Sequence, residues 1–223
     1  MHRTRLRSGL TLVSALLVLW GAASFLLPGQ GAWEPTIRGF EEQDRKTPPP
    51  TNEIVFVGAS MIVRWELKKF FPDLITINRG FGGSEMIDSL HYADRIVIPY
   101  KPRIVVVYAG DNDTAMGTSP EQVAKNFEAL AEKIHAALPR TKIIDLSVKP
   151  SFARWAIVDK QRATNVLLRA ICAKHDYLTF VDVAPLTLGP DGRPRPELYV
   201  PDGLHINDEG YKLWTAALRP YLQ

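Results

Sequence analysis

The sequence has little of what several functional classes require. It contains one cysteine, Cys172, in 223 residues, so no disulfide can form within the chain. Cys172 falls at an apolar helix position, which favours a buried thiol over a reactive one. Histidine is also scarce, with five in the chain, and no Asp-x-His motif or second histidine cluster stands where the first strand is expected to end. We therefore predict no metal site.

An excess of charge of one sign is absent as well. The net charge is +3, from 27 basic and 24 acidic residues. Residues 1–32 contain Arg3, Arg5 and Arg7 but no lysine and no acid, so the 27 basic residues fall to 24 beyond this segment, equal to the 24 acidic residues. A balanced domain offers no basic patch to a nucleic acid, and we expect no nucleic-acid partner.

One long apolar run is present, near the N-terminus. Gly9 to Leu27 holds 19 residues without a charge, follows the three arginines and is ended by Pro28-Gly29. A basic segment followed by an apolar one is the pattern of an export signal. As a helix the run would measure about 28 Å, enough to span a bilayer, so a retained membrane anchor fits slightly better than a cleaved signal peptide. The positive-inside rule then predicts an exported domain, periplasmic or otherwise extracytoplasmic.

The chain divides into three predicted parts. Residues 1–32 form the signal peptide or membrane anchor, and residues 33–52 form a linker with one short helix, Ile37 to Arg45. The linker contains Pro48-Pro49-Pro50, which ends the helix and enforces extended backbone. Residues 53–223 form one domain, and the composition of 46% hydrophobic and 23% charged residues is that of a globular protein.

Beyond the linker, short apolar runs alternate with helical patterns. Continuous β-branched runs are typical of strands covered on both faces. Five are present: Ile54–Val57, Leu74–Ile77, Ile104–Tyr108, Lys142–Ser147 and Leu178–Val181. Strands alternating with helices predict an α/β fold in three layers, α/β/α, with a five-stranded parallel sheet, and five strands suit the flavodoxin-like order 2-1-3-4-5. In that order the ligand crevice opens at the carboxyl ends of strands 1 and 3.

The longest helix between these strands has a clear start signal. Ser119 offers an N-cap, Pro120 takes the first helical position, and Gln122 is placed to close a capping box. Apolar residues then recur at helical spacing as far as Leu138. We interpret this stripe as core and assign no ligand to it.

Small and polar residues follow the strands that border the crevice. Strand 1 runs into Ser60, strand 2 into a turn with Gly82 and Gly83, and strand 3 into Asn112. Acyl transfer needs a nucleophile, a base and donors for an oxyanion. Ser60 supplies a hydroxyl at a helix start, the two glycines let backbone N–H groups approach a ligand, and the Asn112 amide can donate.

His205 is the best placed of the five histidines to act as general base. It stands in a loop just before the final helix, whereas the others fall in the N-terminal segment or on helices. Asp202 precedes it by three residues, so one turn can bring the carboxylate to the imidazole and orient it. The alternative for this pair is a plain helix-entry turn, as the alternative for Ser60 is a helix cap.

In combination these blocks resemble the SGNH, or GDSL-like, hydrolase family. The resemblance covers residues 53–223 and rests on four blocks in the family's order: Gly58-Ala59-Ser60, the turn ending in Gly83, Gly110-Asp111-Asn112-Asp113 and Asp202-Gly203-Leu204-His205. It implies Ser60 as nucleophile, His205 as base and Asp202 as its orienter. It also implies an oxyanion hole from the backbone N–H groups of Ser60 and Gly83 and the amide of Asn112. The family's usual acidic residue before the serine is Ala59 here, which puts the local hydrogen bonding at the helix start in doubt.

The prediction is therefore a serine hydrolase that cleaves carboxylic esters, as an acyl or acetyl esterase or a lysophospholipase-like enzyme, through an acyl-enzyme on Ser60. It needs no cofactor. Its substrate would be a small-molecule, glycan or lipid ester, reached from a domain tethered to the membrane by the N-terminal segment. The sequence selects neither the acyl chain nor the alcohol, does not decide between hydrolysis and acyl transfer, and predicts no oligomeric state.

Two other functions fit parts of the pattern. The acidic, amide and imidazole side chains near the crevice are ligand types for a divalent cation, so a metal-dependent phosphoesterase is one alternative. These side chains are Asp111, Asn112, Asp113, Asp202 and His205. Without a metal, Asp111 and Asp113 are interpreted as structural. A non-catalytic glycan- or lipid-binding module on an esterase scaffold is the other alternative, and only Ala59 supports it.

Two loops remain without a firm assignment. Lys149 to Trp155 follows strand 4 at the same edge of the sheet, where it could form a pocket wall or a solvated loop. Pro185 to Pro201 is long enough for a lid or specificity element. Arg193 and Arg195 within it are interpreted as surface charges.

Overall fold

The computed structural model describes residues 30–223 of the protein, and the predicted signal or anchor over Gly9 to Leu27 lies outside this range. Within residues 30–223, no helix is both long and apolar enough to cross a membrane.

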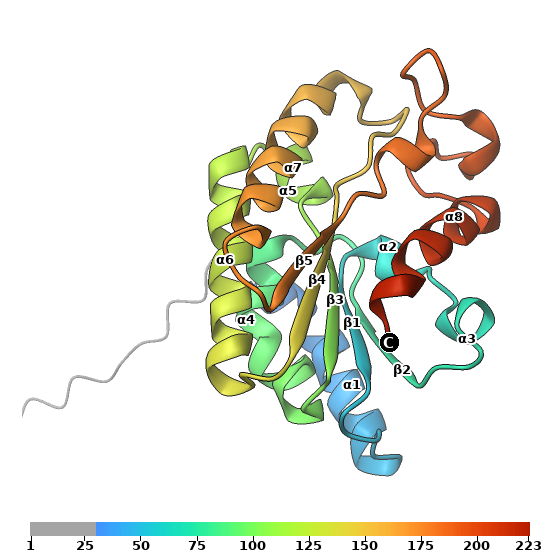
Figure 1. The fold of residues 1–223 in the computed structure, drawn as a ribbon. Helices are drawn as coiled ribbons and strands as arrows, with labels where there is room; N and C mark the ends of the chain where they lie inside the picture. Colours follow the sequence, from blue (N-terminus) through green and yellow to red (C-terminus); the bar gives the residue numbers. More distant parts are fainter. Residues whose placement is uncertain (1–29) are drawn as a thin grey trace, which may run out of the picture.

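A five-stranded parallel sheet occupies the centre of the molecule (Figure 1). Its strands are β1 (Ile54–Gly58), β2 (Thr76–Gly80), β3 (Ile104–Tyr108), β4 (Lys142–Leu146) and β5 (Leu178–Val181). The strand order is β2-β1-β3-β4-β5 and every pair is parallel, which confirms the predicted fold class and order. Gly58 pairs with Gly80 on one side and with Tyr108 on the other, so the carboxyl ends of β2, β1 and β3 meet at one edge of the sheet.

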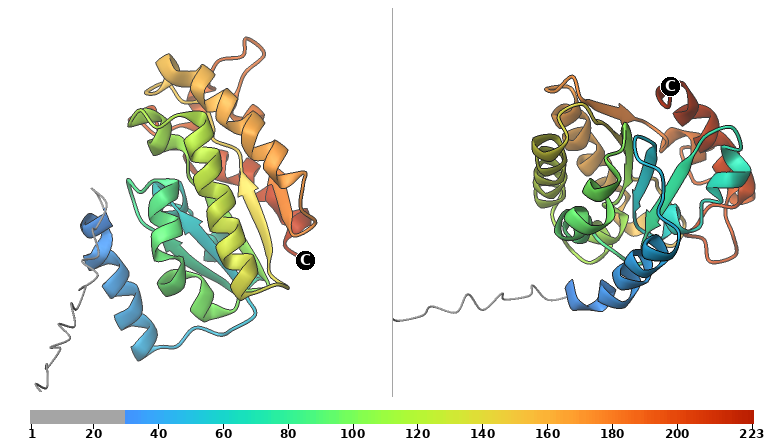
Figure 2. Two further views of the ribbon diagram at one scale, coloured as in Figure 1. Left: turned by 90° about the vertical axis from the view of Figure 1, so that its left-hand side faces the viewer. Right: turned by 90° about the horizontal axis from the view of Figure 1, so that it is seen from below.

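Helices cover both faces of the sheet (Figure 2). They are α1 (Glu34–Lys46), α2 (Ser60–Val63), α3 (Leu67–Phe70), α4 (Met86–Ile96), α5 (Asp111–Ala115), α6 (Pro120–Ala137), α7 (Val158–Cys172) and α8 (Asp208–Leu218). Alternate residues of β1 belong to two cores. Val55 and Val57 pack in the core that α1, α4, α6 and α7 line, whereas Ile54 and Phe56 pack in the core of α2, α3 and α8. The two cores explain why the strands are continuously apolar.

Residues 33–52, predicted as a linker, are packed onto the domain through α1. Ile37 is fully buried in the core that α4 also lines. Arg95 on α4 forms ion pairs with Glu34 and Glu41 on α1, each at 2.7 Å. The helix is longer than the predicted Ile37 to Arg45 because Pro35 fits its first turn and extends it back to Glu34.

The second strand begins two residues later than predicted. Leu74–Ile77 is the apolar run, but β2 spans Thr76–Gly80, and Ile75 is 54% exposed. The polar Asn78 side chain of β2 has hydrogen-bond partners on both sides of its amide, which lets an edge strand carry it. The Asn78 side chain donates to the Ile62 carbonyl at 2.7 Å and accepts from the Gly80 N–H at 2.9 Å.

The predicted capping box of α6 is only half formed. The Ser119 hydroxyl accepts from the Gln122 N–H at 3.2 Å, as expected. The Gln122 side chain instead donates to the Asn126 side chain at 2.8 Å, one turn further along the helix. The prediction that Gln122 closes the box was wrong, because a partner at i+4 competes for the same amide.

Candidate active site

Ser60 is placed by a sharp turn between β1 and α2. Gly58 has a positive φ of 134°, and a Cβ on this residue would stand 2.0 Å from the Tyr108 carbonyl oxygen, so only glycine fits. The Ala59 N–H donates to the same carbonyl at 3.0 Å, and the Ala59 carbonyl accepts from the N–H of Ile62 at 2.9 Å. These backbone bonds begin the helix without an acidic side chain at position 59. They leave Ser60 as the first residue of α2, at the sheet edge where the strand ends meet.

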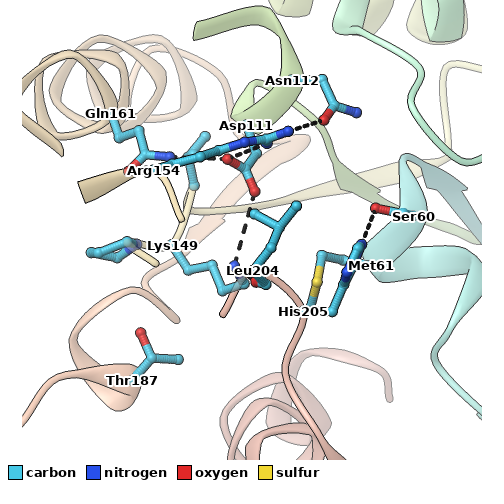
Figure 3. A network of polar contacts seen from close by, with 12 residues as sticks. Ser60, Met61, Asp111, Asn112, Lys149, Arg154, Gln161, Thr187, Leu204 and His205 are labelled. Carbon is cyan, nitrogen blue, oxygen red and sulfur yellow. Dashed lines mark hydrogen bonds and ion pairs between the residues drawn. The ribbon is translucent and has the colours of Figure 1, made fainter. Parts of the chain in front are cut away.

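The loop before α8 brings His205 to Ser60 (Figure 3). The His205 Nε2 lies 2.9 Å from the Ser60 Oγ, and the Nδ1 lies 2.6 Å from Asp202 Oδ2. The other carboxylate oxygen, Oδ1, accepts from the backbone N–H groups of Leu204 at 2.8 Å and His205 at 2.9 Å. The two oxygens of Asp202 therefore have separate tasks: one shapes the loop and the other orients the imidazole.

The charge of Asp202 fixes the tautomer of this imidazole. Partial burial opposes ionisation, but hydrogen bonds from the His205 ring and from two backbone N–H groups hold the pKa of Asp202 well below its usual range. A carboxylate can only accept, so Nδ1 carries the proton and Nε2 is free to accept from the Ser60 hydroxyl. This is the arrangement that a general base needs.

The glycine turn after β2 lies against Ser60. A Cβ on Gly82 would stand 3.9 Å from the Ser60 Cβ, and Gly83 has a positive φ of 82°. The Asn112 side chain, from the first turn of α5, donates through Nδ2 to the Ser84 carbonyl at 2.8 Å. The structure thus ties the predicted oxyanion donor from β3 to the turn that follows β2.

The two aspartates beside Asn112 have different partners. Asp113 is buried and accepts from the backbone N–H groups of Met86 and Gly110, each at 2.9 Å. Burial raises the pKa of Asp113 to about 6, although these hydrogen bonds oppose the shift. Asp111 forms an ion pair with Arg154 at 2.6 Å. Both carboxylates are therefore engaged away from the Asp202–His205 pair, which does not favour a shared metal site.

Sequence reasoning left the loop after β4 undecided, and the structure shows that it carries buried charge. Lys149 is fully buried and donates from Nζ to the Leu204 carbonyl at 2.6 Å, with Asp111 Oδ2 at 3.9 Å. Burial lowers the pKa of Lys149 to about 8, and the Asp111 charge opposes this shift. Arg154 Nη2 donates to Asn112 Oδ1 at 2.8 Å. Two basic residues in the loop after a buried strand were the available signal, but their partners are distant in sequence.

The long loop between β5 and α8 is folded rather than open. It contains an isolated antiparallel bridge between Leu188 and Pro194. The Arg193 guanidinium lies 4.1 Å from the ring centre of Trp155, so this arginine, interpreted as a surface charge, packs on an aromatic side chain. Arg195 pairs with the exposed Glu197 at 2.8 Å, as a surface charge would.

Comparison with known proteins identifies the family. The sequence model of the GDSL-like lipase/acylhydrolase family matches residues 62–213. The chain belongs to this family. Platelet-activating factor acetylhydrolase IB subunit alpha1 of Bos taurus is 27% identical to this acylhydrolase over 201 residues, which cover 87% of the chain and 84% of the relative. The alpha2 subunit of Rattus norvegicus is 27% identical over 169 residues, 71% of each chain.

Solved structures agree with this assignment. A GDSL-like lipase of Bacteroides thetaiotaomicron aligns with the acylhydrolase at a TM-score of 0.70 and 25% identity, covering 83% of this chain and 96% of that one. An acetyl xylan esterase aligns at a TM-score of 0.63 and 17% identity, covering 76% of this chain and 99% of that one, and this likeness shows the fold alone. The protein is accordingly an enzyme that hydrolyses ester bonds.

Proposed function

We propose that this acylhydrolase cleaves carboxylic esters through an acyl-enzyme on Ser60. The observation that carries the proposal is the continuous chain of contacts from Asp202 Oδ2 to His205 Nδ1 at 2.6 Å and from His205 Nε2 to Ser60 Oγ at 2.9 Å. A hydroxyl, a base and an orienting carboxylate in this order form the arrangement that activates a serine.

The reaction has two halves. Ser60 Oγ attacks the ester carbonyl carbon while its proton passes to His205 Nε2, and the carbonyl electron pair moves onto the oxygen. The bond to the alcohol then breaks, and His205 returns the proton to the leaving oxygen. In the second half, water attacks the acyl carbon, gives a proton to His205, and releases the carboxylic acid as Ser60 regains its proton.

The oxyanion formed in both halves needs donors. We assign the backbone N–H groups of Ser60 and Gly83 and the side chain of Asn112 to this role. Support comes from their place at one sheet edge and from the bond of Asn112 Nδ2 to the Ser84 carbonyl, which uses one amide hydrogen and leaves the second. Such donors act most strongly on charge that develops in the transition state.

Acetyl and other short acyl esters are the substrates that we propose first. Two relatives with long alignments are platelet-activating factor acetylhydrolase subunits, whose name specifies removal of an acetyl group. The alcohol partner would be a small molecule, a glycan or a lipid.

The test combines covalent labelling with a substrate series. A fluorophosphonate should label the wild-type enzyme and Ser119→Ala, whose serine caps α6, but not Ser60→Ala. p-Nitrophenyl esters from acetyl to dodecanoyl should be turned over by the wild type, fastest at the short end, and chelators should leave the rate unchanged. Wild-type enzyme that resists the label would argue against a serine nucleophile, and turnover lost to chelation would favour a metal-dependent mechanism.

The cellular position is a separate proposal that rests on the sequence of residues 1–32. The basic and apolar N-terminal pattern supports export, with residues 9–27 retained as an anchor. Fractionation of cells with and without residues 1–32 tests it: the full-length enzyme should be found with membranes and outside the cytoplasm, and the shortened enzyme should remain in the cytoplasm.

A further inference from the structure

Arg154 joins two side chains at the end of β3. Its Nη1 lies 2.6 Å from Asp111 Oδ1, and its Nη2 donates to Asn112 Oδ1 at 2.8 Å. The arginine comes from the loop after β4, 42 residues beyond Asn112 in the sequence, and its side chain is only 18% exposed. Figure 3 shows the guanidinium lying between Asp111 and Asn112.

These partners determine which way the Asn112 amide points. An arginine can only donate, so the atom facing Arg154 must be the amide oxygen. The Ser84 carbonyl can only accept, so the atom facing it must be the amide nitrogen. With both ends of the amide engaged, the nitrogen keeps one hydrogen for a ligand, and its direction is fixed before any substrate binds.

The positive charge also changes the strength of this donor. A charged group hydrogen-bonded to the amide oxygen draws electron density toward that oxygen, and hydrogen bonds in series polarise one another. The N–H at the other end of the amide becomes a better donor to a developing oxyanion. A neutral partner at the same place would orient Asn112 but polarise it less.

The guanidinium is in turn held by a buried acceptor. Asp111 is 4% exposed, and its Oδ1 also accepts from Gln161 Nε2 at 3.0 Å. The Asp111 charge offsets that of Arg154, so the arginine can stay in a partly buried position. Both terminal nitrogens of Arg154 have protein partners, which leaves it poorly placed to bind the substrate directly.

We propose that Arg154 is a positioning residue for catalysis, acting through the Asn112 amide to orient and strengthen the oxyanion donor. This rests on the proposed function of Asn112. It predicts that loss of Arg154 lowers kcat rather than raising KM, because an oxyanion donor acts mainly in the transition state.

A double-mutant cycle with short p-nitrophenyl esters tests the proposal. Asn112→Ala should lower kcat by about a hundredfold or more, as expected for one oxyanion donor. Arg154→Ala should lower kcat by roughly tenfold to a hundredfold with little change in KM, since it weakens that donor without removing it. In the Asn112→Ala background the Arg154 substitution should have almost no further effect.

Two further measurements separate positioning from folding. Guanidinium ion at millimolar concentration should restore part of kcat to Arg154→Ala but not to the double variant. Arg154→Lys keeps the charge beside Asp111 but lacks the planar fork, so it should fold like the wild type and still lose most of the kcat that Arg154→Ala loses. Arg195→Ala is the matched control, because this arginine pairs with the exposed Glu197 at 2.8 Å and should retain wild-type kcat.

These results test the positioning role of Arg154 separately from the proposed ester hydrolysis on Ser60. Equal losses from Arg154→Ala in the wild-type and Asn112→Ala backgrounds, or a rise in KM at constant kcat, overturn the positioning role and leave Ser60 chemistry standing. Wild-type turnover by Arg154→Lys, which retains the charge without the planar fork, overturns the orienting part of this role. An Asn112→Ala enzyme with undiminished kcat removes the oxyanion assignment and the role of Arg154 with it. Activity in Ser60→Ala overturns the proposed function itself.

Discussion

The two oxygens of Asp202 have different hydrogen-bond partners, which leads to a specific prediction for the variant Asp202→Asn. Asparagine has the same shape but one oxygen and one NH₂ group. If its oxygen keeps the place of Oδ1, both backbone bonds to Leu204 and His205 survive. The NH₂ group then faces His205 Nδ1, which must accept, and the ring proton moves to Nε2. In that tautomer His205 donates to Ser60 and cannot take its proton.

The size of the effect follows from two contributions. The asparagine amide could instead turn over, so that its oxygen faces His205 Nδ1 and restores the active tautomer. That orientation loses both backbone bonds to residue 202, at about 0.5–1.5 kcal/mol each, so reaching the active form costs about 1–3 kcal/mol in total. The variant also loses the carboxylate that stabilises the imidazolium formed during the reaction. Two charges about 4 Å apart near a protein surface interact by about 4 kcal/mol. Because the Asp202 side chain is 41% exposed, we take about half of that value.

The sum is about 3–5 kcal/mol, which corresponds to a loss in kcat of roughly a hundredfold to ten-thousandfold. The assay is turnover of a short p-nitrophenyl ester, with thermal unfolding as the check on the fold. Asp208→Asn is the matched control, since this nearby carboxylate pairs with Lys69 at 2.5 Å and not with His205. A loss below about tenfold in a folded Asp202→Asn enzyme would refute the assignment of the tautomer to Asp202.

Three further predictions concern buried ionisable side chains. Asp145 is fully buried on β4, and neither carboxylate oxygen has a hydrogen-bond partner among the described residues. Burial raises the pKa of Asp145, so the folded state keeps a proton that the unfolded state loses above about pH 4. The free energy of unfolding of the Asp145→Asn variant, relative to that of the wild type, should therefore rise by up to about 1.4 kcal/mol per pH unit above that pH. Urea unfolding of both proteins between pH 4.5 and 7 measures this, and a difference between them that does not change with pH would contradict it. In the Asp113→Asn variant the single amide oxygen can replace only one of the two acceptors for the Met86 and Gly110 N–H groups, so the free energy of unfolding should fall by about 1–3 kcal/mol. An unchanged urea midpoint would show that these bonds contribute nothing to stability. The substitution Lys149→Met leaves the partly buried Leu204 carbonyl without its donor, so it should lower the free energy of unfolding by a similar amount, about 1–3 kcal/mol, and also lower kcat. Stability lost at constant kcat would show that this contact does not hold the base in place.

The sequence predicted those parts of the fold and site that depend on local pattern. Apolar runs gave the positions of β3 and β5 and, through the strand order, the edge at which Ser60 and Asn112 would meet. Asp202 and His205 are three residues apart, so their contact also follows from one turn of chain. Each of these inferences needed only neighbours in the sequence and one rule of sheet topology.

What the sequence did not predict depends on contacts between distant residues. Arg154 and Asn112 are 42 residues apart, and Lys149 and the Leu204 carbonyl are 55 residues apart. A basic side chain after a strand has the same local pattern whether it points to water or to a buried acceptor. The offset of β2 has a related cause, because Asn78 is acceptable in a strand only when the Ile62 carbonyl and the Gly80 N–H are present as partners.

The loop after β4 connects the two halves of the candidate site. Ser60 and Asn112 lie at the starts of the helices that follow β1 and β3 in the first half of the domain, whereas His205 lies in the last loop. Arg154 holds the Asn112 amide, and Lys149 holds the carbonyl of the residue before His205. Movement of this one loop would therefore disturb the oxyanion donor and the base together. Because the loop touches both through buried charges rather than through the apolar core, substitutions in it should alter turnover more than their effect on stability alone would suggest.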